Sequence, residues 1–273
     1  SKLPCKRDFI LFNMSKDCMT IANHFLFLQS IQIAMIKKEQ DPMGHAISNY
    51  FHHGDVTSVK VNTNITEGEE LPASYLFRDY DEMPLLEKKA MDLVKGKVLD
   101  VGAGAGAHSL HLQKQGFDVT AMDISELSCE VMRARGLNKV FCKDIWTVES
   151  ESFDTVLFMM NGIGLVKNLQ GLDLFFEYVK KLVKAGGQIL LDSSDIKYMF
   201  EDDEGGFWID LNSDYYGALE YSLAYKDFRA DPFPWLFIDF ERLRASAIKA
   251  GWHVELIYED DHFHYLAKLT ING

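Results

Sequence analysis

The sequence predicts an α/β protein built on one open, twisted, doubly wound sheet of seven strands, mostly parallel, with helices on both faces. Three observations support this fold class. From residue 97 onward, short apolar segments alternate with glycine turns and stretches of helical periodicity. Residues 155–160 are apolar without a break, which is typical of a central parallel strand covered on both sides. Two apolar segments near the end, joined by an acidic turn, predict a C-terminal antiparallel hairpin.

The individual elements follow from the same patterns. Seven segments are predicted as strands: residues 97–101, 117–122, 139–142, 155–160, 188–192, 252–258 and 263–270. Four segments are predicted as helices: residues 107–115, 125–135, 170–184 and 239–250. Ser125 and Asp239 are residue types that cap helix N-termini, and a glycine follows each predicted helix end.

Two parts of the chain do not follow this rhythm. Residues 197–238 are rich in acidic and aromatic residues, and the alternation at 219–225 predicts a half-exposed strand. We interpret this segment as a lid-like insertion within a main domain at 71–273. Residues 1–70 are predicted to be an N-terminal extension, of which residues 1–34 are expected to be peripheral or to lie upstream of the natural start.

Composition excludes several classes of partner. A net charge of −13 disfavours nucleic acid and anionic membrane surfaces. The longest apolar stretch near the start, residues 25–36, is too short and too polar to span a bilayer. Four scattered cysteines without a C-x-x-C pair fit a reducing, cytoplasmic compartment. The sequence gives no indication of the oligomeric state.

The turn after the first predicted strand carries the strongest functional signal. Asp100 precedes the segment Gly102-Ala103-Gly104-Ala105-Gly106. Glycines allow a sharp turn and let a ligand lie against the backbone, and the next helix begins with free N–H groups. The same turn also fits the dinucleotide pattern G-x-G-x-x-A, so a nicotinamide or flavin cofactor is compatible with it as well.

This segment resembles the first motif of the class I S-adenosylmethionine (SAM)-dependent methyltransferases, D/E-x-G-x-G-x-G. The resemblance covers about residues 75–270 and implies a Rossmann-like sheet with SAM as the cofactor. An acid just before the first glycine would repel a pyrophosphate and attract the ammonium group of SAM. We therefore favour SAM, with Asp100 near its ammonium group and Gly102, Ala103 and Gly104 against the ligand.

The resemblance implies further cofactor contacts at the ends of the next two strands. Asp123 is expected to accept hydrogen bonds from the ribose hydroxyls, and Ile124 to pack on the adenine face. Asp144 is expected to accept from the adenine amino group, with Ile145 against the ring. The alternatives are a helix cap for Asp123 and simple turn formation for Asp144.

Two other segments are expected near the methionine end of SAM. Arg78 could pair with the SAM carboxylate, and Tyr75 could close over the sulfonium by a cation–π contact. The alternative is a surface helix with a solvated arginine. Asn161 follows the fourth strand and is expected to line the cofactor. Its sequence, Asn161-Gly162-Ile163-Gly164, departs from the N-P-P-Y pattern of methyltransferases that act on base amino groups.

Catalytic groups are less sharply indicated, because a base is needed only when the acceptor must lose a proton. Asp195 and Tyr215 are the predicted catalytic residues, with Asp192 and Tyr216 as further candidates. A helix cap for Asp195 and a core position for Tyr215 are the alternatives. No metal site is expected, since the acidic, histidine-containing turn at 260–264 is typical of a solvated hairpin.

Taken together, these features predict a SAM-dependent methyltransferase that acts on a small-molecule acceptor, either neutral or cationic. The lid-like insertion would select that acceptor. An NAD(P)-dependent oxidoreductase and a non-catalytic SAM-binding module are the alternative functions.

Overall fold

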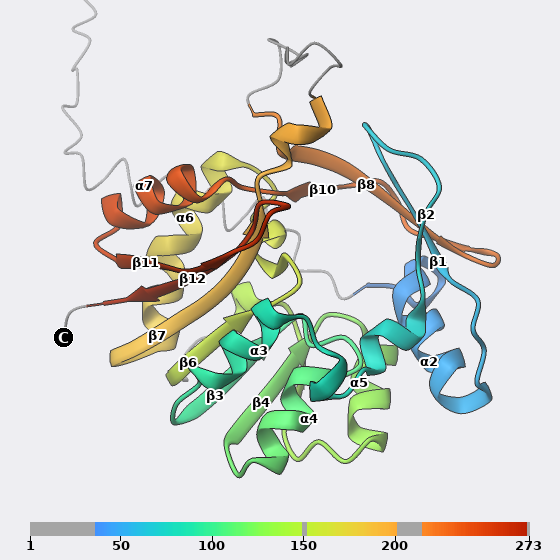
Figure 1. Cartoon of the computed structure of the whole chain (residues 1–273). Coiled ribbons are helices and arrows are strands. Elements are labelled where there is room, and N and C mark those ends of the chain that lie inside the picture. The colour runs from blue at the N-terminus through green and yellow to red at the C-terminus, as the bar shows by residue number, and fades with distance from the viewer. Residues whose placement is uncertain (1–35, 149–151, 201–214, 272–273) are drawn as a thin grey trace, which may run out of the picture. The chain divides into compact units, whose positions relative to one another are not determined.

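The computed structural model describes residues 36–148, 152–200 and 215–271. The expectation for residues 1–34 lies outside the described residues, as does the 201–214 part of the insertion. A seven-stranded sheet dominates the described part, in the order β11-β12-β7-β6-β3-β4-β5 (Figure 1). The strands are β3 (Lys97–Val101), β4 (Asp118–Asp123), β5 (Val140–Cys142), β6 (Phe153–Phe158), β7 (Val183–Ser194), β11 (His253–Glu259) and β12 (His264–Thr270).

The strand directions confirm the predicted topology. Strands β3 to β7 pair with one another in parallel, whereas β12 pairs antiparallel with both β7 and β11. The α-helices are α2 (Pro42–His53), α3 (Leu85–Asp92), α4 (Ala107–Lys114), α5 (Glu126–Ala134), α6 (Leu169–Val179) and α7 (Phe240–Lys249). Short 3₁₀ turns are η1 (Lys38–Gln40), η2 (Ala73–Phe77), η3 (Tyr80–Glu82), η4 (Ile145–Thr147), η5 (Gly162–Val166), η6 (Lys180–Leu182) and η7 (Ile196–Phe200).

Alternation along the central strands divides the core into two layers. In β3, Leu99 and Val101 pack with α6 and α7, whereas Val98 faces α3 and α4. Successive side chains of a strand point to opposite faces, so a strand that is apolar at every position must be covered on both sides. This explains why the unbroken apolar run in β6 lies at the centre of the sheet.

The predicted helix at 170–184 is too long. The α-helix ends at Val179, η6 follows, and β7 begins at Val183 instead of at residue 188. Val183 already pairs with Phe153 of β6, and the register shifts before the pairing resumes at Gln188. The apolar residues near 183 fit a helical stripe and a strand equally well, and only the pairing with β6 decides between them.

A second sheet joins two parts of the chain that are far apart in the sequence. Its strands are β1 (Val59–Thr63), β2 (Glu69–Leu71), β8 (Ala218–Tyr225), β9 (Phe228–Arg229) and β10 (Phe233–Leu236). They are ordered β10-β8-β1-β2, with β9 paired to β8, and every pairing is antiparallel. The strand predicted at 219–225 is confirmed as β8. Its pairing with β1, which lies in the N-terminal extension, was not predicted.

Helix α2 connects this second sheet to the glycine-rich turn. Ala46 packs with Val59 and Tyr225, and Ile47 on the next position packs with Ala105 of the turn. The start of α2 is fixed by Asp41. Its carboxylate accepts a hydrogen bond from Gly44 N at 2.8 Å and another from the Ser125 hydroxyl at 2.5 Å. Helix α2, in the predicted N-terminal extension, therefore packs directly against the glycine-rich turn.

The second sheet also contacts the main sheet through β10 and η5, the turn that follows β6. Gly164 of η5 lies directly against the Trp235 indole, because a Cβ placed on Gly164 would be 2.1 Å from Trp235 Nε1. The close approach requires a residue without a side chain at position 164. No helix within the described ranges has the length and hydropathy to cross a membrane.

We expect Gly164→Ala to lower the free energy of unfolding by about 1 to 3 kcal/mol, because the added methyl group must displace the indole. Chemical denaturation of the purified chain measures this loss. In a Trp235→Leu background the same change should cost at least about 0.5 kcal/mol less, since the clash is gone. Strictly additive effects of the two substitutions would contradict this explanation.

Candidate cofactor-binding site

The glycine-rich turn leaves β3 in a conformation that only glycine adopts readily. Gly102, Gly104 and Gly106 have φ angles of +73°, +56° and +84°. A Cβ on Gly106 would lie 2.8 Å from Leu137 Cδ1, so a larger residue would also have to displace that side chain. A Cβ on Gly102 would meet no described atom within 4 Å. The backbone at Gly102 is therefore open to a ligand.

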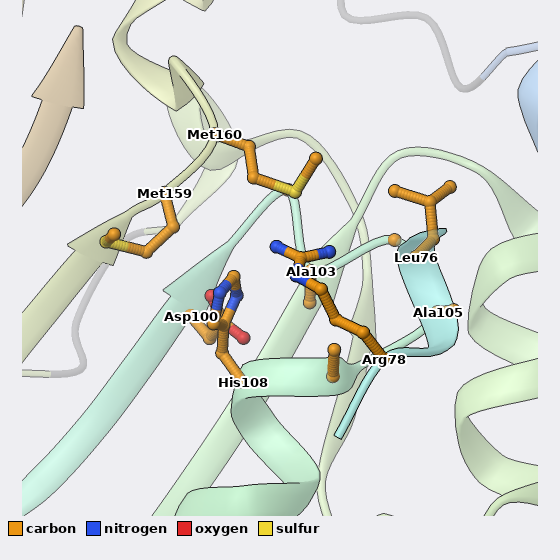
Figure 2. Close-up of a pocket in the computed structure, with 11 residues that line it drawn as sticks. Leu76, Arg78, Asp100, Ala103, Ala105, His108, Met159 and Met160 are labelled. Atoms are coloured by element: carbon orange, nitrogen blue, oxygen red, sulfur yellow. The ribbon is translucent and has the colours of Figure 1, made fainter. Parts of the chain in front are cut away.

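A pocket lies at this turn, at the carboxyl end of β3 (Figure 2). Its floor is formed by the glycine turn and by Asp100. His108 of α4 and Arg78, which follows η2, form one side, and Met159 and Met160 after β6 form the other. Of the predicted cofactor residues, Arg78, Asp100, Gly102, Ala103 and Gly104 line this pocket together.

Asp100 is a buried acid at the floor of the pocket. Its Oδ2 accepts a hydrogen bond from the Ser109 hydroxyl at 2.6 Å. Burial raises the pKa of Asp100, although the nearby His108 and the Ser109 hydrogen bond favour the ionised form. A cationic group in the pocket would favour the ionised form further. This arrangement fits the expected ammonium partner.

Asp123, at the end of β4, connects two backbone segments. Its Oδ2 accepts from Gly104 N at 2.9 Å and its Oδ1 from Ser125 N at 2.9 Å. Burial raises the pKa of Asp123 to about 6. The cap of α5 is Ser125, whose hydroxyl accepts from Ser128 N, so Asp123 is not needed for that purpose. Ile124 beside it is 37% exposed, which leaves an apolar surface next to the turn.

Asp144 and Ile145 are not brought to this pocket. Asp144 caps η4 by accepting from Trp146 N at 3.1 Å, and burial raises its pKa. The Ile145 side chain is buried in the core, and its carbonyl oxygen accepts from the Tyr178 hydroxyl at 2.7 Å. Their contact with an adenine ring stays a prediction.

Arg78 is buried in a network of charges. Its Nη2 donates to both carboxylate oxygens of Glu87, at 2.6 and 2.5 Å, and its Nη1 donates to the Tyr75 carbonyl at 2.6 Å. The Tyr75 ring stacks on the guanidinium at 4.1 Å. Glu87 Oε2 also lies 2.8 Å from His108 Nε2. The alternative of a solvated arginine is therefore wrong, because Arg78 is buried and paired.

Sequence reasoning missed Glu87 and His108. A signal for Glu87 was present, because it falls on the buried stripe of α3 with Leu86, Ala90 and Met91. An acid on the apolar face of a helix must find partners in the fold. His108 carries no comparable signal, since a histidine in the first turn of a helix is usually solvated.

Asn161 binds the protein instead of lining the pocket. Both Met160 and Asn161 have left-handed backbones, with φ angles of 59° and 55°. The Asn161 side chain donates to the Leu236 carbonyl at 3.2 Å and accepts from the Ser193 hydroxyl at 2.7 Å. These bonds connect the ends of β6, β7 and β10, and they hold Met160 at the pocket (Figure 2).

Asp192, at the end of β7, is an acid whose hydrogen-bonding capacity is only partly used by the described residues. Its Oδ2 accepts from Asn161 N at 3.1 Å, whereas its buried Oδ1 has no hydrogen-bond partner in the described part of the chain. Burial raises the pKa of Asp192 to about 7, and the Glu87 carboxylate adds to this shift. A buried carboxylate oxygen without a protein partner is uncommon in folded proteins.

The predicted catalytic residues have partners within the protein. Asp195 Oδ1 accepts from the Tyr216 hydroxyl at 2.7 Å and from Lys197 N at 2.9 Å. The Tyr215 hydroxyl donates to Asp239 Oδ2 at 2.8 Å and accepts from Asp239 N at 2.9 Å. Burial raises the pKa of Tyr215 well above its usual value. A catalytic role for Asp195 and Tyr215 stays a prediction. Among the described residues, no cluster of three or more metal-ligating side chains is found.

Comparisons with known proteins agree with this fold. A family model described as a methyltransferase domain matches residues 98–187. A solved SAM-dependent methyltransferase from Bacteroides fragilis, in complex with S-adenosyl-L-homocysteine, is 41% identical. The match covers 89% of this chain and 100% of that one, with a TM-score of 0.83. No curated protein sequence matches significantly.

More distant structures show the same fold. The PH0226 protein from Pyrococcus horikoshii is 21% identical over 68% of this chain and 88% of its own, with a TM-score of 0.51. The CcbJ methyltransferase from Streptomyces caelestis is 14% identical over 71% of this chain and 95% of its own, with a TM-score of 0.52. At these identities the likeness concerns the fold alone.

A mostly parallel sheet with an open glycine turn at the end of its first strand defines a Rossmann-like protein that binds a nucleoside cofactor. The extent of the match to the Bacteroides protein then fixes the family: the chain belongs to the SAM-dependent methyltransferases. SAM is accordingly the cofactor and the chain is an enzyme, so the dinucleotide and non-catalytic alternatives are wrong.

Gly102 and Gly116 form a matched pair for testing the site. Both have positive φ angles, +73° and +91°, and a Cβ on either would meet no described atom within 4 Å. Gly102→Ala and Gly116→Ala should therefore each cost about 1 to 2 kcal/mol of stability. Only Gly102→Ala should also weaken S-adenosylhomocysteine binding, by about tenfold or more. Calorimetric titration distinguishes them, and equal affinities in the two variants would refute an open ligand surface at Gly102.

Proposed function

We propose that this enzyme transfers the methyl group of SAM to a small-molecule acceptor that is neutral or positively charged. The observation that supports this most directly is the unpartnered, buried oxygen of Asp192 at the carboxyl end of β7. Ligands of open α/β sheets bind outside the carboxyl ends of the strands. A carboxylate at this position attracts a cationic group and repels an anionic one.

The charges around the pocket support the same acceptor class. Asp100, Glu87 and Asp192 are three carboxyl groups, and Arg78 supplies one permanent positive charge against them. The surplus of acid raises the cost of an additional anion in a buried site. The net charge of −13 for the whole chain adds a long-range field of the same sign.

The residues of the pocket fit SAM in their chemistry. When bound, SAM supplies an electrophilic methyl group on a sulfonium. Asp100 would hold the ammonium group, and the open backbone at Gly102 would lie against the ligand. Asp123 would accept from the ribose hydroxyls, with the exposed Ile124 against the adenine. Asp144 and Ile145 remain proposed for the far edge of the adenine.

Asp192 would act on the acceptor. A protonated amine would be held by the ionised carboxylate, which can take one proton from the nitrogen and release it to solvent. The hydrogen bond from Asn161 N fixes Oδ2, and Oδ1 is the oxygen that the described residues leave without a partner. Asp192 serves this purpose better than Tyr215, whose hydroxyl is engaged by Asp239, or Asp195, whose Oδ1 is engaged by Tyr216 and Lys197.

The described part of the insertion at 197–238 is proposed to act as a lid together with β1 and β2. Strands β8 and β10 run past the ends of β6 and β7 (Figure 1). Trp235 contacts the turn that follows Met160 and Asn161. A movement of this second sheet would therefore shift the residues of the pocket. The half-buried aromatic residues of the sheet would present an apolar surface to an acceptor.

Methyl transfer from radiolabelled SAM to a panel of small amines, alcohols and carboxylates tests this proposal. We expect label to appear in neutral or cationic acceptors. Transfer only to carboxylates or phosphates would contradict the acceptor class. Binding of SAM without turnover on any member of the panel would weaken the proposal of a small-molecule acceptor.

The raised pKa of Asp192 predicts proton-linked binding. At pH 7 the free carboxyl is partly protonated, since its pKa is about 7. A nearby sulfonium lowers this pKa, so SAM binding releases a proton and becomes tighter as the pH rises from 6 to 8, by up to about tenfold. S-adenosylhomocysteine lacks the sulfonium charge and should show a smaller effect.

Calorimetry in two buffers of different ionisation enthalpy measures the released protons. Asp192→Asn should remove the difference between SAM and S-adenosylhomocysteine. Asp173→Asn is the matched control, because Asp173 pairs with Ser246 and Lys249 on the α6–α7 layer. Proton release that persists unchanged in Asp192→Asn would show that another group titrates.

A further inference from the structure

The network of Arg78, Glu87 and His108 has a degree of burial that stability alone does not explain. Each of the three side chains belongs to a residue that is 5% exposed. Glu87 accepts from Arg78 Nη2 with both oxygens and lies 2.8 Å from His108 Nε2. A buried ion pair seldom stabilises a fold more than apolar residues of the same volume would. The network therefore calls for a functional explanation.

The three residues come from different elements, and all of them reach the same pocket wall. Arg78 follows η2, Glu87 lies in the first turn of α3, and His108 lies in the first turn of α4. Arg78 and His108 line the pocket at the glycine turn, whereas Glu87 stands behind them. Figure 2 shows the His108 ring in front of Asp100, with the Arg78 guanidinium beside it. Glu87 thus fixes two neighbouring side chains of one wall.

The polarity of this wall follows from hydrogen-bond chemistry. A carboxylate only accepts, so His108 must donate from Nε2 to Glu87. Arg78 can only donate, and its Nε has no partner among the described residues. The Glu87 carboxylate therefore fixes both the Arg78 guanidinium and the His108 ring.

We propose that Glu87 is the positioning residue for the aminoacyl end of the cofactor. By holding the Arg78 guanidinium and the His108 ring, it fixes two of the side chains that, with Asp100, would face the α-carboxylate and the ammonium group. The inference rests on the cofactor binding described under Proposed function. It adds that this polar wall recognises the zwitterionic aminoacyl group. Glu87 contributes by orienting Arg78 and His108, without touching the ligand.

Two probes separate this role from a structural one. S-adenosylhomocysteine carries the aminoacyl group, whereas 5′-methylthioadenosine has the same thioether nucleoside with a methyl group in its place. Calorimetric titration of the whole chain with each probe reports on the two ends of the site. Glu87→Gln should weaken S-adenosylhomocysteine binding by about tenfold or more and change methylthioadenosine binding by less than about twofold.

His108→Gln provides a second, independent variant. Its side-chain amide can still donate toward Glu87 from the position of Nε2, but it has no equivalent of Nδ1. We expect the same selective loss for S-adenosylhomocysteine. Glu82→Gln is the control, because Glu82 is an exposed acid that caps η3 in the same segment. Both affinities should be unchanged in this variant.

Equal losses for both probes in Glu87→Gln and His108→Gln would overturn the proposal, because they would indicate a purely structural network. Unchanged binding of S-adenosylhomocysteine would overturn it as well. If Glu87→Gln does not fold, the selectivity of His108→Gln decides. Failure of the wild-type chain to bind S-adenosylhomocysteine would be a different result, since it would remove the cofactor assignment itself.

Discussion

The hydrogen bond between Gly104 N and the Asp123 carboxylate is the interaction on which the site depends. It holds the glycine turn at the end of β3 against the end of β4, while the Met122 carbonyl accepts from Gly102 N and Ala103 N beside it. The left-handed glycines would otherwise be free to adopt many conformations. With this bond in place, the open backbone at Gly102, the Asp123 carboxylate and the start of α4 have fixed relative positions.

The site is built at a cost to stability. Asp123 and Asp192 have pKa values of about 6 and about 7 in the folded chain, whereas an exposed aspartate has a pKa of about 3.9. The folded state therefore binds more protons than the unfolded state between these values. Its stability falls as the pH rises from about 4 through about 7, because the buried carboxyl groups must ionise. Bound cations and hydroxyl donors offset this cost, so the ligand itself stabilises the fold.

The second sheet provides contacts near the pocket that the central sheet alone would lack. Its strands β1 and β2 precede the main sheet in sequence, and β8 to β10 lie between β7 and β11. Helix α2 packs on this second sheet through Ala46 and on the glycine turn through Ile47. At the other end, Trp235 and the Asn161 side chain connect β10 to the loop that carries Met160. The pocket therefore lies between two contacts of the same sheet. This placement makes the second sheet a suitable element for sensing or enclosing a bound acceptor.

The sequence by itself determined the order of the strands, the hairpin and the glycine turn with Asp100 and Asp123. These features depend on local periodicity and on residues that few other conformations tolerate, such as three alternate glycines after a buried strand. It also placed Arg78 near the site. Only the tertiary structure decided that Glu87 and His108 share that wall, that β1 pairs with β8, that α6 ends at Val179, and that the Asn161 side chain binds the protein. Each of these depends on partners distant in the chain, and periodicity carries no information about such pairings.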